Sequence, residues 1–218
     1  MSLRLCAVSL FAVIAGGCGF GSGVGALDGS LFIRGCNQAD DYGALGALLG
    51  YSMNPTYFVG DPVDSPAYER LHNPVNRISI RMQKSALREE LADGLIVTIA
   101  DDAGVAGAVN TALPLGPATN VRATLKLNET CRYAEADAEL DGTITFSAFG
   151  SATGGAVPRD FHISFDDRLA ATLQVTVVDR RALTLGGVGP VSTTPAAQGQ
   201  LTGSFDFVVR AGRKNPPF

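Results

Sequence analysis

Alternation of apolar and polar residues with a period of two is the feature that most constrains the fold of this chain. In Val75–Lys84 the apolar residues Ile78, Ile80 and Met82 are separated by polar ones, and Val121–Leu127 repeats the pattern. Successive side chains of a strand point to opposite faces, so the alternation predicts strands with one buried and one solvent-exposed face. The pattern predicts an all-β fold.

The same alternation recurs along the chain, with Gly, Pro, Asn and Asp between the segments. The predicted strands are 30–36, 56–60, 75–84, 95–100, 121–127, 143–148, 161–165, 173–177 and 201–209. About nine strands at this spacing are typical of an antiparallel two-sheet β-sandwich, Ig-like or related, with an up-and-down barrel as the alternative. Little helix is expected, and Ser85–Ala92 is predicted to form a short one with Ser85 as its N-cap.

The N-terminus has the composition of an export signal. Arg4 supplies one positive charge, and Leu5–Gly17 is an uncharged apolar run. As a helix this run would span about 20 Å at ~1.5 Å per residue, which is short of the roughly 30 Å hydrocarbon core of a bilayer. A basic start, a short apolar core and small residues at its end predict a signal peptide over residues 1–17.

The residues that end this segment, Ile14-Ala15-Gly16-Gly17 followed by Cys18, resemble the bacterial lipobox, in which the cysteine becomes the lipidated N-terminus. The resemblance implies removal of residues 1–17 and acylation of Cys18, whose acyl chains would hold the protein on membrane lipid. Residues 18–26 are then a glycine-rich tether and 27–218 a single domain.

The residue after the cysteine bears on location. That residue is Gly19. An Asp at this position would favour another destination, whereas glycine favours the outer membrane, on its periplasmic or surface face. The alternative is an ordinary signal peptide cut near Ala26, which would leave a soluble secreted or periplasmic protein.

The four cysteines fit an exported protein. Cys6 leaves with the signal peptide and Cys18 would be acylated, so Cys36 and Cys131 remain in the folded part. Two cysteines in an exported chain predict one disulfide. It would close a loop of roughly 95 residues and stabilise the fold by ~4.7 kcal/mol in the chain-entropy model.

Charge and motifs limit the function. The net charge is −4, and no basic cluster exceeds Arg180-Arg181, so nucleic acid is not an expected partner. His72 and His162 have no partners at local metal or catalytic spacing and are predicted to be surface residues. No nucleophile elbow, zinc or phosphate-loop motif occurs, so neither a catalytic residue nor a cofactor is predicted.

Aspartate pairs are the main polar feature. Asp40-Asp41, Asp101-Asp102 and Asp166-Asp167 each lie where a strand should end. Calcium takes about six to eight oxygen ligands, so carboxylates from several loops could form a site, with Asp101, Asp102, Asp166 and Asp167 as weak candidates. The competing interpretation is that Asp favours turns because its side chain bonds nearby backbone amides.

Aromatic residues around the proline-rich segment Asp61–Pro74 are the candidate binding surface. Tyr57, Phe58 and Tyr68 would contact an envelope protein or a glycan if they are exposed. The equal alternative is that they close the end of the core.

The later half of the chain, with Gly142-Thr-Ile-Thr-Phe146, Phe161-His-Ile-Ser-Phe165 and Gly203-Ser-Phe-Asp-Phe207, resembles β-rich envelope lipoproteins of myxobacteria. That family implies a place in the cell envelope and no enzymatic activity. The expected function is therefore a membrane-anchored structural or binding module. The alternative is an envelope-associated hydrolase or a calcium-dependent binding protein that uses loop carboxylates.

Overall fold

The computed structural model describes residues 23–33, 49–62, 78–85, 91–131, 137–155, 167–178 and 197–208. In chain order the elements are β1 (Gly23–Ile33), β2 (Leu49–Met53), β3 (Tyr57–Pro62), β4 (Ile78–Gln83), β5 (Asp93–Ile99), α2 (Asp102–Gly107), β6 (Ala112–Leu115), β7 (Val121–Leu127), β8 (Asp137–Gly150), β9 (Arg168–Val178) and β10 (Ala197–Val208). Strands dominate, so the predicted all-β class is confirmed.

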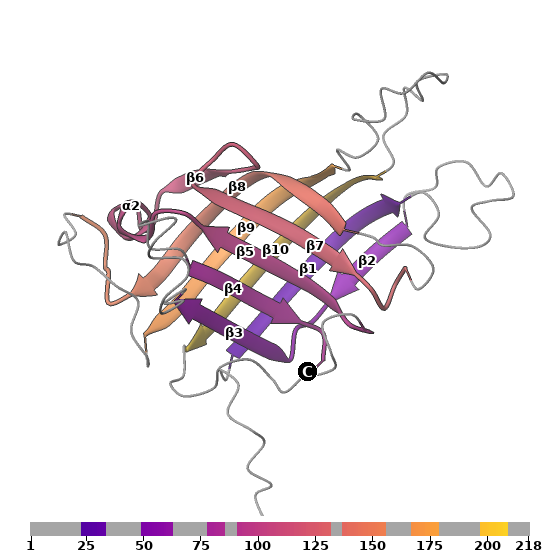
Figure 1. Ribbon diagram of the computed structural model, residues 1–218, viewed down its shortest axis with the longest axis horizontal. Helices are drawn as coiled ribbons and strands as arrows, with labels where there is room; N and C mark the ends of the chain where they lie inside the picture. The colour runs from indigo at the N-terminus through magenta and orange to yellow at the C-terminus, as the bar shows by residue number, and fades with distance from the viewer. Residues whose placement is uncertain are drawn as a thin grey trace, which may run out of the picture.

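These strands form one ten-stranded sheet in the order β2-β1-β10-β9-β8-β6-β7-β5-β4-β3, with an additional pairing of β7 and β8. The pairing of β6 with β7 is parallel, and the other ladders are antiparallel. In Figure 1 the half with β7, β5, β4 and β3 lies in front of the half with β8, β9, β10 and β1, and the strands of the two halves cross. The sheet is therefore curled on itself as a half-barrel.

The predicted two-sheet sandwich is wrong, because β8 pairs with strands of both halves and joins them into one sheet. This strand is 14 residues long, and its first part, from Asp137 to Leu140, pairs with β7. The next part, from Gly142 to Thr145, pairs with β6, while β9 follows the opposite edge. The hydrogen bonds therefore run without a break from one half to the other. Alternation could not show this, since a sandwich and a curled sheet both bury one face of each strand.

Three glycines lie in line across neighbouring strands of the sheet. Gly29, Gly142 and Gly199 lie within one residue of the cross-strand row Ser30–Gln200–Thr176–Asp141. A Cβ at these positions would lie 2.1 to 2.2 Å from a backbone oxygen of the neighbouring strand. Glycine kinks and bulges give a sheet its curvature, and β8 also has a bulge between Phe146 and Ala148.

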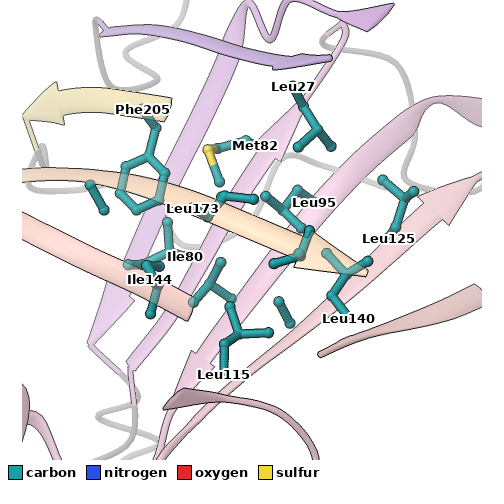
Figure 2. Packing of buried hydrophobic residues seen from close by; sticks show 14 of the residues in the cluster. Leu27, Ile80, Met82, Leu95, Leu115, Leu125, Leu140, Ile144, Leu173 and Phe205 are labelled. Carbon is teal, nitrogen blue, oxygen red and sulfur yellow. The ribbon is translucent and has the colours of Figure 1, made fainter. Parts of the chain in front are cut away.

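The concave side of the curled sheet holds the hydrophobic core. Figure 2 shows leucine, isoleucine, methionine and phenylalanine side chains from both halves meeting there. Phe58 of β3 stacks on Phe207 of β10, with ring centroids 5.4 Å apart, and both rings are 1% exposed. Because these strands belong to opposite halves of the sheet, the pair fastens one half over the other.

The first strand begins earlier than the sequence predicts. Gly23–Ala26, placed in the tether by composition, pairs with Ser204–Phe207 of β10. A Cβ on Gly23 would lie 2.3 Å from the Cβ of Phe207, so glycine permits the close approach of the two strands. The glycines here belong to the sheet, and any tether is confined to the residues before Gly23.

Two outer strands of the sheet are consecutive in the chain. β2 and β3 lie at opposite edges, yet only Asn54–Thr56 separates them. Three residues span at most about 14 Å between the flanking Cα atoms. One corner of each edge must therefore lie close to the other, which nearly closes the curl.

The structure has a helix at a position where none was predicted. α2 caps the end of β5, and the predicted helix Ser85–Ala92 falls largely on residues 86–90, which lie outside the described residues. Among the residues that the structure describes, no helix has the length and apolar character needed to cross a bilayer. The predicted strand at 161–165 also lies outside the described residues.

Candidate functional site

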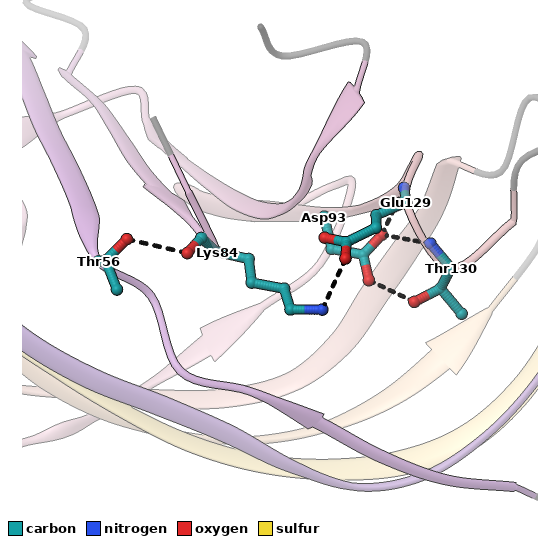
Figure 3. A network of polar contacts seen from close by, with 5 residues as sticks. All are labelled: Thr56, Lys84, Asp93, Glu129 and Thr130. Atoms are coloured by element: carbon teal, nitrogen blue, oxygen red, sulfur yellow. Dashed lines mark hydrogen bonds and ion pairs between the residues drawn. The ribbon is translucent and has the colours of Figure 1, made fainter. Parts of the chain in front are cut away.

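The densest polar cluster surrounds Asp93, the first residue of β5, whose side chain is buried with the residue 2% exposed. One carboxylate oxygen accepts hydrogen bonds from the backbone N–H groups of Glu129 and Thr130, at 2.9 and 3.0 Å. The other oxygen accepts from the Thr130 hydroxyl. Figure 3 shows how these contacts hold the turn after β7. A buried carboxylate is stable only when its oxygens are satisfied in this way.

Neighbouring residues tie the Asp93 cluster to the edge of the sheet. The Lys84 ammonium lies 2.9 Å from a carboxylate oxygen of Glu129. The Thr56 hydroxyl donates to the Lys84 carbonyl at 2.9 Å. The cluster thus joins the link between β2 and β3, the end of β4 and the turn after β7 (Figure 3).

Tyr51 of β2 lies beside this cluster. Burial, and after it the negative charge of Asp93, raises the pKa of Tyr51 well above its ordinary value. The hydroxyl is buried and makes no hydrogen bond of good geometry to a protein group. The tyrosine beside this carboxylate therefore stays a neutral phenol. The contacts of the Asp93 cluster therefore hold neighbouring segments of the fold together.

Cys131 follows the turn that Asp93 holds. It is 1% exposed and disulfide-bonded, and its N–H donates to the Leu127 carbonyl at 2.6 Å. Cys36, the predicted partner, lies outside the described residues, so the pairing of the two stays a prediction.

The pairing can be tested by substitution. We expect Cys36→Ser and Cys131→Ser each to abolish the mobility difference between oxidised and reduced protein on a denaturing gel, because either change removes the loop that compacts the unfolded chain. Cys6→Ser is the control and should leave the difference intact. A persistent shift in Cys36→Ser would assign another partner to Cys131.

Asp101 caps the helix α2, and Asp102 lies in its first turn. The Asp101 carboxylate accepts from the Gly104 N–H at 3.1 Å and is the N-cap of α2. Its backbone N–H and carbonyl both bond the side chain of Asn120, at 2.6 and 2.9 Å. Such capping satisfies backbone groups that the first turn leaves free. Asp102 is 4% exposed in the first turn.

The described calcium candidates, Asp101, Asp102 and Asp167, do not form a metal site. Within the described ranges, no three His, Cys, Asp or Glu side chains are grouped so that they could hold a metal ion. Asp167 precedes β9, whereas Asp166, Asp40 and Asp41 lie outside the described residues. His72 and His162 lie outside them as well. The observed role of Asp101 is the turn-forming one.

The aromatic candidates are divided in the same way. Tyr57 and Phe58 lie in β3, 3% and 1% exposed, and Phe58 belongs to the core. At these exposures neither ring can contact another molecule, so the two positions fit the interpretation that the aromatics close the end of the core. Tyr68 lies outside the described residues.

One small depression lies over β4, β5 and β7. The shallow depression of about 10 Å³ is lined by seven residues, Arg81, Met82, Gln83, Ala92, Gly94, Ile96 and Lys126. That volume holds about one water molecule. The depression is too small for a substrate.

An ion pair marks the other end of the sheet. Arg168 of β9 donates to Asp206 of β10 from two nitrogens, with Nε at 2.7 Å from Oδ1. The hydrogen bonds from Arg168 lower the pKa of Asp206. Both side chains are largely exposed, at 59% and 39%, so the pair adds little stability. The pair itself carries no net charge.

Comparison with known proteins adds no assignment: no family model, curated protein or solved structure matches this chain. Inference about function therefore rests on the residues themselves. Of these, sequence reasoning missed Asp93. The sequence signal was an acidic residue directly before the apolar run Gly94-Leu95-Ile96-Val97. An acid at the start of a buried strand is itself buried unless a turn exposes it.

Proposed function

We propose that this protein is an exported lipoprotein, anchored through Cys18 to the outer membrane, whose curled sheet acts as a structural or binding module and not as an enzyme. The observation that carries the proposal is the disulfide at Cys131. Disulfides persist in oxidising compartments and are rare in the cytosol. The bond supports the export that the apolar N-terminus and the lipobox-like segment predict.

The acidic residues support a non-enzymatic role. The Asp93 carboxylate accepts from two backbone amides and the Asp101 carboxylate from one, and each holds a turn or a helix end. A general acid or base needs a proton exchanged with substrate, whereas both oxygens of Asp93 are committed to the backbone and hydroxyl donors of the turn at Glu129 and Thr130. The outer face of β8, β9 and β10 carries Thr, Ser and Gln side chains, which suit contact with water or with a polar envelope partner.

Substitution of the anchoring residue tests the proposal. In the native host, Cys18→Ser should move the protein from the membrane fraction to the soluble periplasmic or secreted fraction, because the acyl chains are lost. Incorporation of labelled fatty acid should be lost with it. Cys6→Ser is the matched control, since that residue lies in the segment predicted to be removed. Equal membrane association of wild type and Cys18→Ser would show that the anchor is elsewhere or absent.

A further inference from the structure

The distance between the proposed anchor and the sheet is short. β1 begins at Gly23, so only four residues separate it from Cys18. The five Cα–Cα steps from Cys18 to Gly23 span at most about 18 Å when fully extended. If Cys18 is acylated, as the proposed function requires, the start of β1 cannot stand further than this from the lipid headgroups.

Antiparallel pairing determines what else lies at that end. Gly23 is opposite Phe207 near the end of β10, and Val208 is opposite Arg168 at the start of β9. Gly150, the last residue of β8, is opposite Arg168 in turn. Figure 1 shows the start of β1 beside the arrowhead of β10 at the lower side of the sheet. These strand ends form one surface next to the anchor.

The surface carries an exposed apolar side chain. Val24 is 70% exposed, although Val is usually buried in folded proteins. It lies opposite Asp206, on the outward face that Asp206 and Arg168 share. Two of the guanidinium nitrogens bond Asp206, so Arg168 keeps N–H groups that can donate to phosphate or glycerol oxygens. The Asp206–Arg168 pair carries no net charge that anionic lipid would repel.

We infer that this end of the sheet, formed by Val24, Val208, Arg168 and Asp206, rests on the headgroup layer of the membrane. The short connection holds it there, Val24 is buried among the lipid headgroups, and Arg168 bonds to them. The opposite ends of the same strands, at Ile33 and Ala197, point away from the bilayer. β1 spans about 33 Å from Gly23 to Ile33, so those ends are the part of the domain that an envelope partner reaches.

A single tryptophan reports on this contact, because the chain contains none. Val24→Trp places the reporter at the proposed contact. Gln200→Trp is the matched control: Gln200 is exposed, lies on the same face of the same strand pair opposite Ser30, and is about 20 Å further along the strands. Full-length acylated protein is reconstituted into phosphatidylcholine–phosphatidylglycerol vesicles with or without a headgroup nitroxide lipid.

In vesicles, the emission of Val24→Trp should be quenched by the nitroxide lipid at least threefold more than that of Gln200→Trp, and should shift to shorter wavelength. Insertion of ten Gly/Ser residues between Ser22 and Gly23 should abolish the difference while the protein stays in the membrane fraction. Equal quenching of the two reporters in protein that remains anchored would overturn the docking surface alone.

Two other results separate this inference from the proposed function. Protein with intact Cys18 that never enters the membrane fraction refutes the anchor and the docking surface together. A blue shift of Val24→Trp that depends on protein concentration in detergent, without vesicles, would assign the surface to a second copy of the chain and overturn the lipid contact.

Discussion

Gly142→Ala should destabilise the protein by about 3 kcal/mol or more, because its Cβ would collide with the backbone of β9. The Cβ would lie 2.2 Å from the Gln174 carbonyl oxygen and 2.9 Å from the Cα of Val175, at a φ of 157°. Neither atom can move without separating β8 from β9. In a chain of this size the loss corresponds to roughly 6–12 °C in Tm.

Gly50→Ala is the control for that experiment. Gly50 lies in an edge strand, and a Cβ there has no atom within 4 Å, so we expect a change within about 0.5 kcal/mol. The free energy of unfolding of both variants is measured by urea denaturation with the disulfide intact. If the two variants have the same midpoint, the line of glycines does not set the curvature of the sheet.

Asp93→Ala should cost a similar amount, about 3 kcal/mol or more, because it removes a buried carboxylate and leaves the part-buried N–H groups of Glu129 and Thr130 without their acceptor. Asp93→Asn should cost less, since the amide keeps one carbonyl oxygen. We expect the loss to appear as faster hydrogen exchange in the turn after β7 as well as a lower midpoint in urea.

Glu129→Gln separates the buried contacts of this cluster from its exposed ion pair. The Lys84 and Glu129 side chains are 45% and 35% exposed, so removing the charge should change stability by less than about 1 kcal/mol. A loss in Glu129→Gln as large as that in Asp93→Ala would mean that the ion pair, and not the buried carboxylate, stabilises the turn.

Alternation predicted most of the strands because burial on one face is a local property of sequence. The predicted strand Val121–Leu127 coincides with β7, and β4, β5, β8, β9 and β10 overlap their predicted segments. The pattern failed where glycine or proline interrupts it. β2 follows a glycine-rich apolar run, and β6 contains Pro114, so neither was predicted.

The arrangement of the strands and the role of Asp93 depend on contacts between distant residues. Asp93 is 37 residues from Thr130, and no local pattern identifies that partner. Composition placed Gly23 in the tether because glycine has no side chain to pack, yet glycine is needed where two backbones approach closely. The same ambiguity concealed Gly142, whose neighbour in space is a residue of β9.

The position of the last strand has a consequence for how the molecule is assembled. β10 lies between β1 and β9, so the first described strand finds its full-length neighbour only when Ala197–Val208 has been made. Until then the strand edges of β1 and β9 that β10 later covers stay open to other chains. Folding dominated by such distant pairing is slow. If the chain is exported and acylated as proposed, this order of strands keeps it unpacked for longer during those steps.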